Sequence, residues 1–152
     1  MRSMLVIALV LAGCASDDPA PTVTVLSVSP DNINPLDDLT DDVRILIEYE
    51  DSDGDLGDGF AQVHDCRDEQ LVTQLPIPAI APMDVIGEPI RGSMDLHLTD
   101  IGSGTSAALP AVCDELGVSF ASGETVFCVV LVDAKDHEGP GDCTTPVTVY
   151  AP

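Results

Sequence analysis

The sequence predicts an all-β fold, an antiparallel β-sandwich of about seven short strands with one short helix. Residues 43–50 and 90–99 alternate apolar and polar side chains, which is typical of strands with one face in a core and the other in solvent. Residues 125–132, TVFCVVLV, are apolar on both faces and should form a central strand. Turn residues separate such segments at regular intervals, as in sandwiches. A small barrel is the alternative architecture.

The individual strands follow from residue type and alternation. In the second strand the odd-numbered residues from Val43 to Tyr49 should face the core. In the fifth, Met94, Leu96 and Leu98 should do so, with charged residues between them in solvent. The turn at residues 66–69 separates two short strands. The expected strands are 22–29, 43–50, 60–65, 70–75, 90–99, 125–132 and 145–150.

One helix is expected near residues 110–116. Pro110 suits a first helical position, Gly117 suits the stop, and AVCDEL lies between them. Residues 76–89 hold four prolines and should be irregular. There is no internal repeat and no second domain, so the sandwich is expected to cover residues 22–151.

The N-terminus indicates export. One positive charge precedes the apolar run 4–12, which fits a signal-peptide core and is too short to span a bilayer. The run ends in Leu11-Ala12-Gly13-Cys14, which resembles the lipobox of bacterial lipoprotein precursors. The resemblance implies cleavage after residue 13, palmitate-type acyl chains on Cys14, and a membrane anchor followed by a polar tether over residues 14–21. Without an Asp directly after Cys14, the resemblance favours the outer membrane.

The composition limits the partners. With 27 acidic and 5 basic residues the formal net charge is −22, a field that repels nucleic acid and anionic lipid and favours cations. Glycan-binding sites usually rely on aromatic platforms, and the chain has no Trp, two Tyr and three Phe. The expected partners are the membrane, through the lipid, and an unidentified envelope or extracellular protein.

Four further cysteines predict two disulfides in an exported chain. Four cysteines allow three pairings. Closeness along the chain favours Cys113–Cys128, which leaves Cys66–Cys143. The pairing Cys66–Cys128 with Cys113–Cys143 is the alternative.

The strand pattern resembles immunoglobulin-like and fibronectin-III-like modules of bacterial surface lipoproteins. In such modules a D-x-DGDLG loop often follows the second strand, and here residues 51–57 read DSDGDLG. A motif like V-x-D-x-x-G-N often ends the penultimate strand. Here residues 132–139 read VDAKDHEG, which departs from that motif through charged residues. The resemblance implies an Ig-like sandwich over about residues 22–151.

The acidic loop after the second strand is the candidate metal site. Alternating Asp and Gly can offer calcium the oxygens that it prefers. An EF-hand is excluded, because its sixth and twelfth positions would be Leu56 and Gln62. In an Ig-like sandwich the loop before the last strand emerges at the same end. The expected calcium ligands are Asp51, Asp53, Asp55, Asp58, Asp133 and Asp136. The alternative is a solvated turn.

No catalytic motif such as G-x-S-x-G, H-E-x-x-H or S-x-x-K is present. We therefore expect no enzyme, no catalytic residue and no cofactor other than calcium. The predicted function is a membrane-anchored exported lipoprotein with a structural or protein-interaction role. The alternative is a cell-envelope hydrolase that uses carboxylates near residues 51–58.

Overall fold

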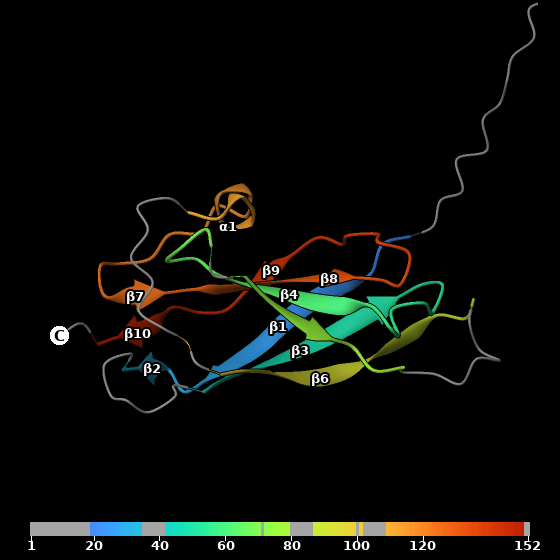
Figure 1. Cartoon of the computed structure of the whole chain (residues 1–152), viewed down its shortest axis with the longest axis horizontal. Helices are drawn as coiled ribbons and strands as arrows, with labels where there is room; N and C mark the ends of the chain where they lie inside the picture. Colours follow the sequence, from blue (N-terminus) through green and yellow to red (C-terminus); the bar gives the residue numbers. More distant parts are fainter. Residues whose placement is uncertain are drawn as a thin grey trace, which may run out of the picture.

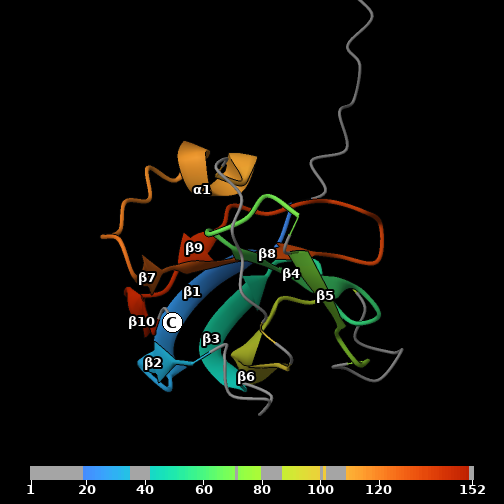
Figure 2. The same ribbon diagram turned by 60° about the vertical axis from the view of Figure 1, so that its left-hand side comes forward.

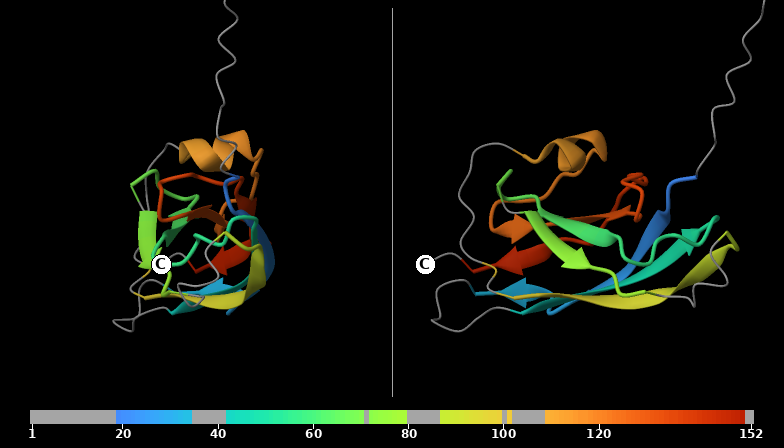
Figure 3. Two further views of the ribbon diagram at one scale, coloured as in Figure 1. Left: turned by 90° about the vertical axis from the view of Figure 1, so that its right-hand side faces the viewer. Right: turned by 45° about the vertical axis from the view of Figure 1, so that its right-hand side comes forward.

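The computed structural model describes residues 19–34, 42–70, 72–79, 87–99, 101 and 109–150 of the chain. Over these residues it is a two-layer β-structure with a short helix on one outer face (Figures 1 and 2). One layer is a three-stranded sheet in the order β1-β3-β6, and the other is a four-stranded sheet in the order β5-β4-β8-β9. Figure 3 shows the two layers facing each other.

The first layer is antiparallel and built around β3 (Val43–Asp51), with β1 (Thr22–Ser29) and β6 (Ile90–Leu98) on its two sides. The odd-numbered residues of β3 are buried and most of the even-numbered ones are exposed, as the alternation predicts. Leu96 and Leu98 of β6 are buried as well. Because alternate residues of a strand point to opposite faces of the sheet, β3 and β6 bury one face, and this face packs on the core between the two layers.

The second layer is centred on β4 (Phe60–Asp65) and β8 (Phe127–Val132), with β5 (Val72–Pro76) and β9 (Asp142–Cys143) at its edges. Every residue of β8 is buried. This confirms the predicted central strand, and the reason is that both faces of β8 are covered. Its odd-numbered side chains join the main core between the layers, and Cys128 joins a second cluster under the helix.

A small third sheet closes one end of the molecule. It has the order β2-β10-β7, where β2 (Asn32–Ile33) pairs parallel with β10 (Val147–Val149) and β7 (Glu124–Thr125) pairs antiparallel with it. The last strand, predicted over residues 145–150, is present but shortened to β10. The two-residue strand β9 before it was not predicted and belongs to the four-stranded sheet. The described strands form separate sheets and not a closed barrel. The first layer holds β1, β3 and β6 and the second holds β4, β5, β8 and β9, so the chain crosses between the two layers several times. This arrangement agrees with the predicted antiparallel β-sandwich of the Ig-like kind.

The helix α1 (Ala111–Glu115) confirms the helix expected near residues 110–116. The prediction that Pro110 is the first helical residue is wrong. Pro110 directly precedes the helix, with φ −53° and ψ 143°. Gly117 adopts φ +65° and donates to the Asp114 carbonyl, while the Val118 N–H donates to the Cys113 carbonyl. This pair of bonds is a Schellman motif, which ends the helix where glycine tolerates the left-handed conformation.

The predicted disulfide pairing is wrong, and so is the alternative pairing. The structure joins Cys66 to Cys113 and Cys128 to Cys143. The reason is the placement of two elements. The helix α1 lies over the outer face of the four-stranded sheet (Figure 2). Its residue Cys113 packs there against Cys66 in the turn after β4, and Cys143 on β9 pairs directly with Cys128 on β8. Closeness along the sequence predicts neither of these two contacts.

Candidate metal centre at the acidic loop end

Two loops meet at one end of the sandwich (Figure 1). The β3–β4 loop, residues 52–59, crosses between the layers, and the β8–β9 loop, residues 133–141, joins two strands of one sheet. The Ala134 N–H donates to the Asp55 carbonyl at 3.2 Å. Gly59 lies so close to the Val132 carbonyl that a Cβ there would clash with backbone. Glycine at this position lets the first loop pack against the end of β8.

Three carboxylates gather inside the β3–β4 loop. Asp51, Asp53 and Asp55 each offer an oxygen, and these oxygens lie within 4.8 Å of one another. Asp51 is 1% exposed and Asp55 is 8% exposed, so the group is largely withdrawn from water. Gly54 adopts φ +73°, and this turn allows residues on both sides of it to face Asp51. We call these three residues the acidic cluster.

Asp51 fixes the loop backbone. Its Oδ2 accepts a hydrogen bond from the Leu56 N–H at 2.8 Å, and its Oδ1 accepts a longer one from the Asp53 N–H at 3.4 Å. Burial raises the pKa of the Asp51 carboxyl above its ordinary value of 3.8, and the side chain of Asp53 adds to that rise. The cluster therefore carries an electrostatic cost that a cation would lower.

Lys135 supplies one such cation from the other loop. Its Nζ lies 2.8 Å from Asp55 Oδ2 and 3.2 Å from Asp53 Oδ2, so its side chain bridges the two loops. The Oδ1 atoms of Asp53 and Asp55 are buried without any hydrogen-bond partner, and Asp55 Oδ2 has the ion pair but no well-directed hydrogen bond. Buried carboxylate oxygens without partners are costly, so the cluster has unused capacity for a cation.

The other predicted ligands do not join the acidic cluster. Asp133 is buried, but its Oδ1 accepts from the Lys135 and His137 backbone N–H groups at 2.8 and 2.9 Å, and its Oδ2 lies 3.0 Å from His137 Nδ1. It shapes the β8–β9 loop. Asp58 and Asp136 are exposed and occupy left-handed backbone positions with φ of 67° and 66°. The structure thus brings together three of the six residues.

The sequence reasoning missed Lys135. It is the only lysine of the chain, and it stands between Asp133 and Asp136, the acids that made this segment a candidate. A lone cation in a chain of this charge could have marked a paired position.

A pocket of about 360 Å³ opens beside Asp51, at the ends of β3 and β6. Its lining is mostly polar and includes one basic residue. The lining residues are Glu50, Asp51, Ser52, Pro89, Ile90 and Arg91. This pocket is the place to look for hydrolytic chemistry near the loop.

Comparisons of the chain with protein-family models, with curated proteins and with solved structures found no match. The chemistry of the site therefore has to be argued from its own residues. Within the part of the chain that the structure describes, no helix is long and apolar enough to cross a membrane. Cys14 lies outside the described residues.

Proposed function

We propose that the chain is an exported lipoprotein, anchored through Cys14 to the bacterial outer membrane, whose Ig-like domain has a structural or protein-interaction role and is stabilised by calcium at the acidic cluster. The lipobox-like residues 11–14 support the anchor. Two disulfides support an oxidising compartment. The observation that carries the calcium proposal is the pair of buried, unpartnered Oδ1 atoms on Asp53 and Asp55.

The donor set fits calcium better than zinc. Calcium prefers carboxylate and carbonyl oxygens in flexible arrangements, whereas protein zinc sites rely on sulfur and nitrogen. Asp51, Asp53 and Asp55 would hold the ion, and further oxygens would come from backbone or water, since calcium takes six to eight. The charge also fits: three carboxylates and Lys135 leave a net charge of about −2.

The role of the ion would be mechanical. The β3–β4 loop joins the two layers, and the β8–β9 loop packs on it through Ala134 and Lys135. A cation at the acidic cluster removes carboxylate repulsion and holds the first loop in the conformation that the second loop contacts. The two loops at this end of the domain would then keep one fixed conformation.

A thermal melt of residues 15–152 tests this proposal. We expect millimolar calcium to raise Tm by several degrees over EDTA, since a ligand at about 100 times its Kd adds about 2.7 kcal/mol. Magnesium at equal ionic strength should raise Tm by less than calcium does. Asp53→Asn should abolish the shift, and Asp136→Asn, outside the cluster, should keep it. Equal shifts with calcium and magnesium, or a shift that survives Asp53→Asn, would refute the site.

Lys135→Met separates the two possible counter-charges. If the cluster takes calcium, this variant should lose stability in EDTA and regain most of it with calcium. If Lys135 alone neutralises the cluster, calcium will not restore the variant.

The anchor needs its own test. We expect expression in a Gram-negative host with radioactive palmitate to label the wild-type chain and to leave Cys14→Ser unlabelled. Separation of the two membranes then locates the labelled protein. An unlabelled wild type would refute the anchor without touching the calcium proposal.

A cell-envelope hydrolase is the second candidate, because the pocket beside Asp51 combines a carboxyl of raised pKa with Arg91. The backbone hydrogen bonds to both oxygens of Asp51 favour the structural role instead. Turnover of envelope glycans or peptides that Asp51→Asn abolishes, with an unchanged melt, would establish the enzyme.

A further inference from the structure

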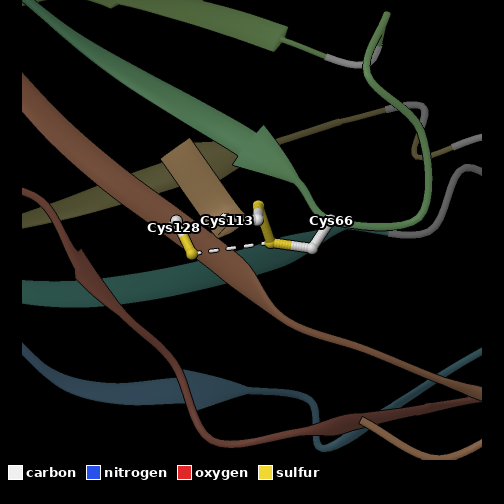
Figure 4. Close-up of side chains that lie close together, drawn as sticks. All are labelled: Cys66, Cys113 and Cys128. Carbon is white, nitrogen blue, oxygen red and sulfur yellow. Dashed lines mark hydrogen bonds between the residues drawn. A yellow bond between two sulfur atoms is a disulfide. The ribbon is translucent and has the colours of Figure 1, made fainter. Parts of the chain in front are cut away.

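The two disulfides lie against each other beneath α1. Sγ of Cys66 is 3.5 Å from Sγ of Cys128, and Cys66 is bonded to Cys113 (Figure 4). Cys128 is bonded in turn to Cys143. Neither sulfur carries a hydrogen, so the contact is not a hydrogen bond. The two bonds and this contact connect the four sulfurs in the order Cys113, Cys66, Cys128, Cys143, and we call this connected series the sulfur row. Three of them, those of Cys66, Cys113 and Cys128, lie within 4.8 Å of one another.

The row is open to solvent at one end only. Cys66, Cys113 and Cys128 are at most 1% exposed, whereas Cys143 is partly exposed on the two-residue edge strand β9. A thiolate must reach a sulfur in order to attack it. An external thiol can therefore approach the row at Cys143 and is kept from the Cys66–Cys113 bond.

We propose that the four cysteines form a thiol–disulfide exchange site that passes reduction from Cys143 to Cys113. A small-thiol or dithiol reductant attacks Cys143 Sγ, forms a mixed disulfide there, and releases the Cys128 thiolate. The Cys128 side chain, no longer tied to β9, turns its Sγ onto neighbouring Cys66 Sγ. A Cys66–Cys128 bond forms, the Cys66–Cys113 bond breaks, and the Cys113 thiolate takes a proton from water.

A second thiol completes the reaction. It attacks the reductant's sulfur in the mixed disulfide and releases Cys143 as a thiol. In total two reductant thiols become one disulfide, and one of the two protein disulfides becomes the thiols of Cys113 and Cys143. The remaining bond, Cys66–Cys128, joins the turn after β4 to the neighbouring strand β8.

The consequence of the exchange is local. Cys113 is the buried residue of α1, and among the described residues its bond to Cys66 is the only disulfide between the helix and the sheet. After exchange α1 would rest on the second cluster through noncovalent packing alone, which Val126 and partly buried Val112, Val118 and Phe120 provide. The proposal does not depend on calcium or on the lipid anchor.

Partial reduction tests the proposal. Residues 15–152 are treated under native conditions with one equivalent of dithiothreitol, quenched in acid, alkylated and mapped by mass spectrometry. We expect the main one-disulfide species to contain Cys66–Cys128, with Cys113 and Cys143 alkylated. Recovery of Cys66–Cys113 with alkylated Cys128 and Cys143 would show independent disulfides and overturn the proposal. The proposal would also be overturned if dithiothreitol reduced neither disulfide of the folded protein.

Two single variants give a matched comparison. Cys143→Ser leaves a free Cys128 next to Cys66, and we expect part of this protein to carry Cys66–Cys128 with a free Cys113. Cys128→Ser leaves a free Cys143, which lies outside the group of close sulfurs, and its Cys66–Cys113 bond should stay intact. The same pairing in both variants would overturn the proposal, and circular dichroism checks that both are folded.

Discussion

Asp65 brings a carboxylate into the interior at the end of β4, where it is 5% exposed. It accepts hydrogen bonds from the Arg67 guanidinium at 2.5–3.0 Å and from Thr125 Oγ1 at 2.7 Å. Both side chains of the ion pair are nearly inaccessible to solvent. These contacts join the turn after β4 to β7, directly beside Cys66.

We expect Arg67→Met to be among the most destabilising single changes. It leaves the Asp65 carboxylate buried without its cation, and breaking a buried pair costs about 3–5 kcal/mol. Urea unfolding measures the loss. The double variant Asp65→Asn with Arg67→Met should recover part of it, because the amide carries no charge. A loss below about 1 kcal/mol for Arg67→Met would contradict this account.

His64 should make stability depend on pH. Burial lowers the pKa of its imidazole from the ordinary 6.5, only partly opposed by the charge of Glu138, and its Nδ1 has no hydrogen-bond partner. The unfolded chain then binds a proton more readily than the folded one. The contribution of neutral His64 to the free energy of unfolding is therefore fully present above about pH 6.5. It is lost progressively as the pH drops from there toward the lower pKa of the folded state.

The variant His64→Gln should therefore lose less stability between pH 7.5 and pH 5.5 than the wild type, as measured by urea unfolding at each pH. His97→Gln on β6 is the matched control, because that side chain is 45% exposed. Parallel pH profiles for wild type and His64→Gln would contradict the assignment.

At the scale of elements, α1 depends on its C-terminal stop as well as on its disulfide. Gly117 has φ +65° and nothing within 4 Å of a built Cβ, so an alanine there meets backbone strain and no clash. We expect Gly117→Ala to destabilise by about 1 kcal/mol. Glu115→Ala, on the exposed side of the same helix, should be nearly neutral in the same thermal melts. A neutral Gly117→Ala would mean that α1 contributes little to the measured unfolding.

Elements with strong periodicity were predictable, and contacts between elements were not. The alternation in 43–50 and the two-sided apolar character of 125–132 gave β3 and β8 with their buried faces, because each pattern reports the local environment of a strand. The cysteine pairing depended on how α1 lies over the sheet and on the register of β8 with β9. No local pattern encodes either relation.

At the scale of the whole molecule, the fold predicted that the two acidic loops meet at one end of the sandwich. It did not predict which of their acidic side chains lie close together. An Ig-like sandwich places the β3–β4 and β8–β9 loops together, and the structure does so through Ala134 and Lys135. The membership of the acidic cluster could not be predicted, because it depends on the backbone turns within each loop. Gly54 lets Asp53 and Asp55 face Asp51, whereas Asp133 is occupied by its own loop.

The chain also enters the domain at that end. Thr22 pairs with Glu50, next to Asp51, and Gly139 of the β8–β9 loop packs closely on the Pro21 carbonyl. On the proposed anchoring, the eight residues from Cys14 to Pro21 span at most about 29 Å. The acidic end would then face the lipid headgroups and be repelled by anionic ones, so the domain would stand upright. The opposite end, with β2, β7 and β10, would be the one that the surroundings meet first (Figure 1).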